Sequence, residues 1–326
     1  MALAQQIAKR LVALALVLFL VTLFTSYLLS LAPGDPVSTL VPLNEGDPRV
    51  EEMRSDLKER LHLDKPFVQR YGYWLGDFVS GDFGSRYTVS GKDPVVDHVK
   101  DALPVTLQLI FYSQVLALVV AVPLGVATAY RAGSFFDRST NATAFGLLSI
   151  PNFVLGLALA YYVGVWLHWL PNTGYTEFGN DPVEHFRRMA LPTITLAAGQ
   201  IAVYMRLLRS DMVQTLQEDF IQMARSKGIS DRRVLWRHAL RPSSLTVLTV
   251  AGLNVGALIG GAVVVEYIFS VPGLGFELVR AIGERQYVAM QSFVAIIAII
   301  YVLVNFTVDI LYTIIDPRIR HVRATS

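Results

Sequence analysis

The residues of this chain that could perform chemistry are few. A phosphate-binding loop needs glycines spaced ahead of a Lys and a Ser or Thr, so that backbone N–H groups and an ammonium surround the phosphates. Gly91 and Lys92 are followed by Asp93 and lack that spacing. The sequence also contains no His-Glu-x-x-His pair for zinc and no Gly-x-Ser-x-Gly turn for a nucleophilic serine. It therefore predicts that this chain neither hydrolyses ATP by itself nor acts as another enzyme.

Cysteine and histidine chemistry has equally little support. The chain contains no cysteine, which excludes disulfides, thiolate metal ligands and cysteine nucleophiles. The six histidines are scattered, and we predict that they are interfacial or surface residues rather than metal ligands: His62, His98, His168, His185, His238 and His321. We expect no metal and no cofactor in this chain.

A basic segment, QMARSKGISDRRVLWRHALRP at residues 222–242, interrupts an otherwise apolar sequence. We call residues 211–241, which contain most of it, the basic loop. Gly228 permits a backbone conformation that a side chain would restrict. Before this glycine, the residues at helical spacing are Phe220, Met223, Ala224 and Lys227.

The second half of the basic loop also has helical signals. Ser230 or Asp231 can cap a helix that continues through Trp236 and Leu240, and Pro242 is expected to mark the start of the next apolar stretch. The pattern therefore predicts a helix, a glycine turn and a second helix.

Two interpretations of the basic loop stay open on spacing alone. It could be a solvated loop that only fixes membrane topology and touches anionic lipid. It could instead be a docking surface for a cytoplasmic protein, because small residues such as Ala224 and Gly228 permit a close approach and the flanking charges orient a partner.

The composition indicates that lipid is part of the solvent of this chain. Of its 326 residues, 53% are hydrophobic and 17% are charged, whereas a soluble domain has about 25% charged residues. The net charge of +2 is too small to indicate a nucleic-acid partner.

Six stretches approach the roughly 20 apolar residues that a transmembrane helix needs. They are residues 11–31, 103–130, 142–170, 189–208, 244–268 and 288–315. The fourth is the least apolar, because Gln200 and Arg206 interrupt or end it. The first could be a signal peptide, since Lys9 and Arg10 precede it, but its length and the following Pro33 favour an uncleaved anchor. We predict an all-α polytopic membrane protein with six transmembrane helices.

Basic residues in short connections predict the orientation of these helices. Arg131 and Arg138 flank the second connection, and the basic loop has an excess of Arg and Lys. The C-terminal tail contains Arg318, Arg320 and Arg323. These three segments are therefore expected on the same side of the membrane as Lys9 and Arg10. Both termini are therefore expected in the cytoplasm.

The segment of residues 32–101 is expected outside the cell. It holds two amphipathic patterns, DPRVEEMRSDLKERL and KPFVQRYGYWLGDFVSG, the second with an apolar face of Phe67, Tyr71, Trp74, Leu75 and Phe78. Packing on the outer ends of the spans is the simpler interpretation, and a ligand pocket is the alternative. The expected organisation is a first helix (1–31), this external segment (32–101) and a five-helix core (102–326).

Polar residues inside apolar spans are costly and suggest function. Gln108, Gln200, Asn254 and Glu266 are our candidates for lining a path across the membrane. The alternative is that such amides, Gln114 included, join helices to one another. Glu266 and Asp309 lie near predicted span ends that water can reach, and for Asp309 we favour a pair with a cytoplasmic Arg.

The basic loop resembles the cytoplasmic signature of permease subunits of ATP-binding-cassette importers. That signature is Glu-Ala-Ala, three residues, Gly, nine residues, then Ile-x-Leu-Pro. Ala224, Gly228 and Leu240 agree with it. Gln222, Met223 and His238 depart from it. The signature places its proline at position 241, where this chain has Arg241, and the proline follows one residue later as Pro242.

The resemblance extends along nearly the whole chain. The segments LAPGDPV, LDKPFVQRYGYWLGDFVSGDFGSRY, LPVTLQL, SIPNFVLGLALAYY, VEYIFSVPGLG and DILYTIIDPRIR resemble permeases of the dipeptide, oligopeptide and nickel type. Within that type they resemble the first-named of the two permease subunits.

This resemblance implies the type I importer permease fold and a set of partners. They are a second permease subunit, two cytoplasmic ATPase subunits that bind ATP and Mg²⁺, an extracytoplasmic binding protein and membrane lipid. It implies a bacterial or archaeal plasma membrane and a peptide substrate. The coupling residues it implies are Phe220, Met223, Ala224, Lys227, Gly228, Ile229, Ser230, Arg233 and His238.

Other functions remain alternatives. Related systems carry nickel chelates, glutathione or oligosaccharides. A channel or secondary transporter that works alone is a different class, but such proteins commonly contain paired repeats, and residues 1–160 and 161–326 show no convincing one. A membrane anchor that recruits cytoplasmic proteins would bind through the loop without transport.

Overall fold

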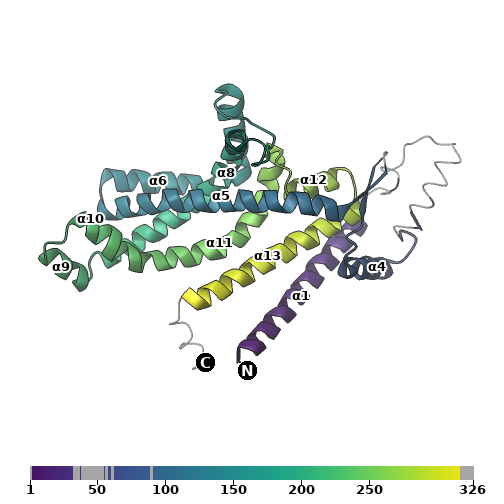
Figure 1. The fold of residues 1–326 in the computed structure, drawn as a ribbon, viewed down its shortest axis with the longest axis horizontal. Coiled ribbons are helices and arrows are strands. Elements are labelled where there is room, and N and C mark those ends of the chain that lie inside the picture. The colour runs from purple at the N-terminus through teal and green to yellow at the C-terminus, as the bar shows by residue number, and fades with distance from the viewer. Residues whose placement is uncertain are drawn as a thin grey trace. The chain divides into compact units, whose positions relative to one another are not determined.

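The computed structural model describes the backbone of residues 2–31, 37, 55, 58–59, 62–88 and 91–315, with the side chains of most of them. Nearly all described elements are helices (Figure 1). They form two compact units, a first unit of residues 1–105 and 272–303 and a second unit of residues 106–271 and 304–326. The long helices α5 (Val95–Tyr130) and α13 (Tyr287–Ile315) contribute to both.

Among the described residues, four helices are long and apolar enough to cross a membrane. They are α5, α8 (Pro182–Thr215), the continuous helix Asp231–Phe269 that includes α11 (Leu240–Phe269), and Tyr287–Val308 of α13. A bent pair of helices makes a fifth crossing if it is counted as one, and Ala15–Leu31 of α1 (Ala2–Leu31) is a shorter apolar helix. The predicted class, a helical multi-pass membrane protein, is confirmed.

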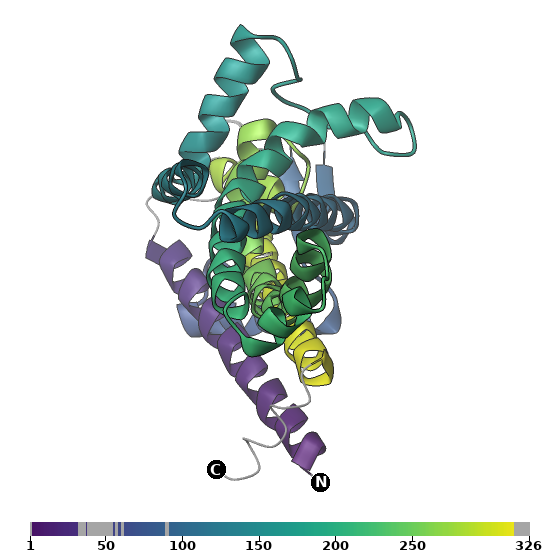
Figure 2. The same cartoon turned by 90° about the vertical axis from the view of Figure 1, so that its left-hand side faces the viewer.

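The stretch predicted as a third span, residues 142–170, is divided. It covers the second half of α6 (Phe135–Ser149), followed by α7 (Asn152–Leu159) and η1 (Ala160–Trp166), and the chain bends by 101° between α6 and the helix Asn152–Trp166. Ile150 has φ −90° and ψ 121°, because the residue before a proline is forced out of the helical region, and Pro151 follows. In Figure 2 this segment turns away from α6 at the top of the view.

Helix α8 is the least apolar of the four spans and also the most buried. In its most apolar 18-residue window 61% of residues are buried, against 33–39% in the other three. Its neighbours are α6, α7 and α11, so its polar residues face protein rather than lipid. It begins at the N-cap Asp181, whose carboxylate accepts the N–H groups of Val183 and Glu184.

The second amphipathic pattern of residues 32–101 is confirmed as α4 (Phe67–Ser80), with Tyr71 and Trp74 buried. The Trp74 indole Nε1 donates to Ser292 Oγ of α13 at 3.2 Å, and the hydroxyls of Tyr71 and Thr22 of α1 lie 2.9 Å apart. Helix α4 is thus tied to α1 and α13 within the first unit. Most of the first pattern, together with the side chain of Asp309 and His321, lies outside the described residues.

A β-hairpin that the sequence did not indicate follows α4. It consists of β1 (Ser85–Thr88) and β2 (Gly91–Pro94), and it packs near α12 (Leu274–Gly283). The guanidinium of Arg86, 2% exposed, donates to Glu277 and Glu284 at 2.6 Å each. Gln286 bonds both the N–H and the C=O of Tyr87. Buried charge pairing and one amide therefore hold the hairpin, and neither follows from periodicity.

This attachment should weaken in acid. Partial burial by itself would raise the pKa of Glu284, but hydrogen bonds from Arg86 and Arg280 outweigh it and hold the pKa below its ordinary value of 4.5. Because the folded pKa is the lower one, the stabilisation is complete above the unfolded pKa and is lost as pH falls through the folded pKa. We expect amide hydrogens of residues 85–94 to exchange faster below about pH 4 than at pH 7, after correction for intrinsic rates. Equal protection at both pH values, measured by mass spectrometry, would contradict this, and Glu284→Gln should lessen the difference.

Candidate functional site

Helix α9 (Asp219–Ser226) forms the first half of the basic loop. Its residues Ile221 and Ala224 are 0% and 7% exposed and pack in a hydrophobic cluster with Val234 and Leu235 from the second half. The helix ends at Lys227, and Gly228 follows with φ +75°, the left-handed conformation that glycine adopts without strain. The predicted helix and glycine turn are present.

The second half of the basic loop continues into a membrane helix. It consists of α10 (Asp231–Arg233) and η2 (Val234–Ala239), which run into α11. Of the two predicted N-cap residues, Ser230 and Asp231, the structure has Ser230 at the N-cap. Its side chain makes no capping hydrogen bond. The second helix of the loop and the next span form one continuous helix from Asp231 to Phe269, and Pro242 lies inside it rather than at a break. The wide turn of η2 just before it shifts the hydrogen-bond register, which lets the helix accept a residue without an N–H.

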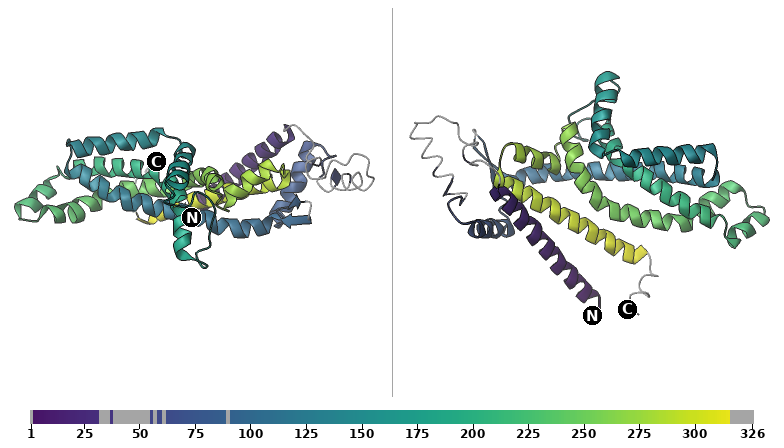
Figure 3. Two further views of the ribbon diagram at one scale, coloured as in Figure 1. Left: turned by 90° about the horizontal axis from the view of Figure 1, so that it is seen from above. Right: turned by 180° about the vertical axis from the view of Figure 1, so that it is seen from behind.

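The outer surface of the basic loop is apolar and basic. Phe220 and Met223 of α9 are 46% and 57% exposed, and Lys227 lies on the same helix face. Figure 3 shows this helix pair at the end of α8 and α11 in two further views. Gly228 has open space where a Cβ would lie. Exposed apolar side chains beside cations are typical of an interaction surface.

The predicted coupling residues divide between this surface and the interior. Ala224 faces inward, so its small side chain serves the packing of the loop itself. Ile229 and His238 are half-buried, whereas Ser230 and Arg233 are exposed. The residues left for contact with a partner are chiefly Phe220, Met223, Lys227, Gly228, Ser230 and Arg233.

An ion pair that sequence reasoning missed fixes the helices beside the loop. Arg209 of α8 donates through Nε and Nη2 to the two carboxylate oxygens of Asp137 at 2.5 and 2.6 Å. Asp137 is 2% exposed and also accepts from the Gly133 N–H and the Asn141 amide, each at 2.8 Å. The turn before α6 is thereby attached to α8, the helix that leads into the basic loop. The sequence carried a signal for the start of α6, the Ser134-x-x-Asp137 capping pattern, in which Ser134 Oγ accepts the Asp137 N–H. It carried none for the pair with Arg209.

Three amides of the spans lie in one polar cluster. Asn254 of α11 donates to Gln200 of α8 at 2.9 Å. The Tyr204 hydroxyl donates to Gln114 of α5 at 3.2 Å, and Gln114 in turn donates to the backbone oxygen of Ala251 at 3.3 Å. These bonds connect α5, α8 and α11, as the helix-joining alternative predicts. The amide side chains remain half-buried, so part of each is open.

The other two path candidates lie apart from this cluster. Gln108 accepts from the Tyr175 hydroxyl at 3.2 Å, and burial raises the pKa of that hydroxyl. Glu266 is fully buried and accepts from the Thr106 hydroxyl at 2.7 Å. The expectation that water reaches Glu266 near a span end is therefore wrong, because neighbouring protein covers it. Thr106, Tyr175 and Tyr204 were missed, since hydroxyl side chains are ordinary in membrane helices.

Several helices long and apolar enough to cross a membrane, with a folded loop that exposes apolar and basic side chains, define a multi-pass membrane protein. Residues 121–321 match the family described as binding-protein-dependent transport system inner membrane component. The chain belongs to this family.

Relatives agree over nearly full length. One relative is a probable peptide ABC transporter permease of Sinorhizobium fredii, to which this chain is 36% identical over 315 residues. The aligned region covers 97% of this chain and 99% of the relative. It is 38% identical over 307 residues, 92% and 94% of the two chains, to the oligopeptide transport system permease AppB of Bacillus subtilis. It is 37% identical over 337 residues, 97% and 99%, to the di/tripeptide transport system permease DppB of Pseudomonas aeruginosa.

Proposed function

We propose that this chain is the membrane-spanning subunit of an ATP-driven importer that takes up di- or oligopeptides across the bacterial plasma membrane. The family match and the peptide permeases among its relatives support the class and the substrate. The single structural observation that carries it is the exposed Phe220 and Met223 on a basic, folded loop. A loop that only fixed topology would have no reason to expose two large apolar side chains to solvent.

The proposed topology has six spans, with both termini in the cytoplasm and residues 32–101 outside. The sixth span is α1, whose 30 helical residues are enough to cross a bilayer of about 30 Å. The distribution of basic residues supports the orientation. The remaining five spans form the core of residues 102–326.

The proposed partners are a second permease subunit, two ATPase subunits that bind ATP and Mg²⁺, and an extracytoplasmic binding protein. The ATPase contacts the outer surface of the basic loop. Movement of the ATPase is transmitted from α9 through Ile221 and Ala224 to Val234 and Leu235, and these two residues lie in the helix that continues into α11. The Arg209–Asp137 pair passes it from α8 to α6. Such a rigid connection lets nucleotide binding and solute access share a coupling free energy.

Gln108, Gln200 and Asn254 stay our candidates for the translocation path, whereas the full burial of Glu266 argues against it as a lining residue. The Gln200–Asn254 pair supports the proposal most directly, because both side chains are half-buried and present amide groups beside the bond they share. Amide donors and acceptors suit a peptide backbone of any sequence.

Two neighbouring substitutions to the same residue test the docking surface. Met223→Glu places a carboxylate on the exposed apolar strip, and should lower copurification of the ATPase and peptide uptake by about tenfold, the effect of losing one central interface contact. Gln222→Glu adds the same charge on another side of α9, where the family signature has Glu, and should leave both near the unchanged level. Uptake of a labelled tripeptide and pull-down of the ATPase are the measurements. Equal effects of the two changes, or none from Met223→Glu, would count against the proposed contact.

A further inference from the structure

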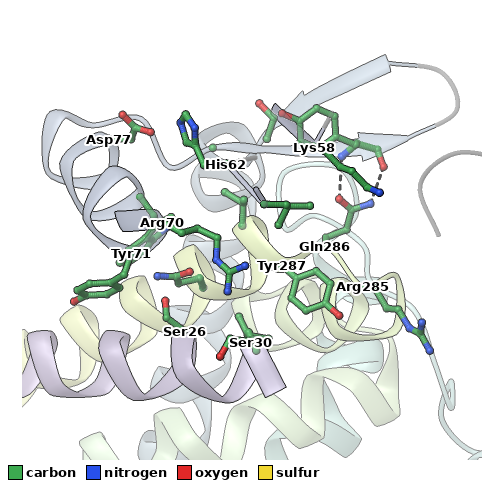
Figure 4. A pocket seen from close by; sticks show the side chains of 18 of the residues that line it. Ser26, Ser30, Lys58, His62, Arg70, Tyr71, Asp77, Arg285, Gln286 and Tyr287 are labelled. Atoms are coloured by element: carbon green, nitrogen blue, oxygen red, sulfur yellow. Dashed lines mark hydrogen bonds between the residues drawn. The ribbon is translucent and has the colours of Figure 1, made fainter. Parts of the chain in front are cut away.

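A cavity of about 590 Å³ lies in the first unit, and none of the residues assigned above to coupling or transport lines it (Figure 4). It is bordered by the end of α1, by α4, by the β1–β2 hairpin and by the start of α13. Its size falls within the roughly 300–1,000 Å³ of small-molecule sites. Its apolar lining includes Leu29, Phe67, Tyr71, Trp74 and Val288.

Two nitrogen groups that line the cavity have no hydrogen-bond or ion-pair partner among the described residues. Gln291 is only 8% exposed, and its Nε2 makes no hydrogen bond among the described residues. The half-buried Arg70 forms no ion pair with any side chain in the described part of the chain. Figure 4 shows its guanidinium reaching toward Ser26 and Ser30 of α1. Gln291 is a buried donor, and buried donors are normally satisfied, so the site lacks an acceptor.

The acidic residues around the cavity do not neutralise Arg70. Asp64 pairs with Lys65 at 2.8 Å, and Asp82 accepts the backbone N–H of Gly84 at 2.8 Å. Asp77 is exposed, and in Figure 4 it lies well away from the end of the Arg70 side chain. The missing acceptor is therefore an anion.

The surroundings indicate that this anion has an apolar part. On α1 next to the cavity, Tyr27, Leu28 and Leu31 are 49%, 50% and 62% exposed, the pattern of a helix that faces lipid. Tyr27 meets Phe67 edge to face with ring centroids 5.9 Å apart, at the rim of the cavity. Aromatic rings of this kind mark the level of phospholipid headgroups. An anion in the cavity could thus continue into an apolar chain along α1.

We propose that this cavity binds the phosphodiester of a glycerophospholipid. Arg70 supplies a planar pair of N–H donors, which matches two phosphate oxygens, and the Gln291 amide supplies a third donor. The acyl chains lie along Tyr27, Leu28 and Leu31. The bound lipid fixes α4 to α1 and α13, and it also explains why a buried amide is left open within the protein.

Lipid retention by the full-length chain tests this proposal. The chain, purified in mild detergent, should carry about one phospholipid in native mass spectrometry, and after delipidation it should bind dihexanoylphosphatidylglycerol. Arg70→Gln should weaken that binding by about tenfold, because a charge-assisted pair of hydrogen bonds is lost. Gln291→Glu keeps the shape of the side chain, replaces the amide donor by a carboxylate that repels phosphate, and should abolish retention. Lys100→Gln removes a cation that is 68% exposed and does not line the cavity, and should change nothing.

The competitors separate the possible sources of the anion. Inorganic phosphate should displace the lipid only weakly, and the dipeptide Ala-Ala should not displace it at all. Equal lipid retention in all four proteins would overturn the proposal. So would binding of Ala-Ala without lipid, which would make this a peptide site, and phosphate binding as tight as lipid binding, which would make it a site for a free anion. After delipidation, when no protein gains stability from bound lipid, equal unfolding temperatures of the variants and the unchanged chain show that the variants remain folded.

Discussion

Replacing Asp137 with alanine should destabilise the second unit by about 3 kcal/mol, the lower end for a buried ion pair that loses one partner. Arg209 is 28% exposed and keeps some access to water, which is why the lower end applies. The N–H of Gly133 and the amide of Asn141 also lose their acceptor. Thermal unfolding of the purified chain in detergent, followed by the fluorescence of its four Trp residues, measures the effect.

Two further variants show whether the pair itself is responsible. Arg187→Ala, on the same helix, removes a cation that is 53% exposed and lies 3.4 Å from Glu184. It should cost less than about 1 kcal/mol, as exposed pairs do. The double change Asp137→Leu with Arg209→Met should recover part of the stability lost in Asp137→Ala, since no unpaired charge remains. Similar costs for Asp137→Ala and Arg187→Ala would mean that the pair does not hold α6 to α8.

Hydropathy predicted the helices that lipid surrounds, because a span facing hydrocarbon must be apolar along its length. It gave the weakest signal for α8, where neighbouring helices take the place of lipid and polar residues are tolerated. It could not show the 101° bend after α6, although Pro151 was visible, since a proline can also be accommodated within a helix. Pro242 shows this directly: it lies inside a continuous helix that the sequence pattern divided.

Features that depend on distant residues could not be predicted. Arg86 is bonded to carboxylates 191 and 198 residues away, and Arg209 to one 72 residues away, so no local pattern carries either pairing. The sequence did place Phe220, Met223, Ala224 and Gly228 in one folded loop. It could not show that Ala224 turns inward while Met223 turns outward, because the burial of each face depends on Val234 and Leu235 in the second half of the loop.

Ala224 is buried, whereas Gly228 has open space beside it, so substitutions at the two positions should act in different ways. Sequence spacing alone predicts the same effect for both. Ala224→Trp would force a large side chain into a packed cluster, at a cost of about 1–3 kcal/mol, and would damage the loop before any partner arrives. Gly228→Val meets no neighbouring atom within 4 Å, so its effect comes from the backbone and from whatever docks there. A β-branched residue at φ +75° is strongly disfavoured. Gly228→Val is therefore the better probe of coupling.

Gly228→Val should reduce peptide uptake and peptide-stimulated ATP hydrolysis to a few per cent, on the order of the loss from misplacing a critical contact. The amount of chain in the membrane should hardly change, and the loss of stability should not exceed the strain of one left-handed residue, about 1–2 kcal/mol, because the buried cluster of Ile221, Ala224, Val234 and Leu235 is untouched. Gly228→Asn is the matched control, since Asn adopts the left-handed conformation with little strain, and it should retain substantially more uptake than Val. Full uptake by the Val variant would show that the turn at Gly228 takes no part in coupling. If Asn and Val were equally inactive while the ATPase still copurified, the role of Gly228 would lie in the space it leaves open rather than in its backbone conformation.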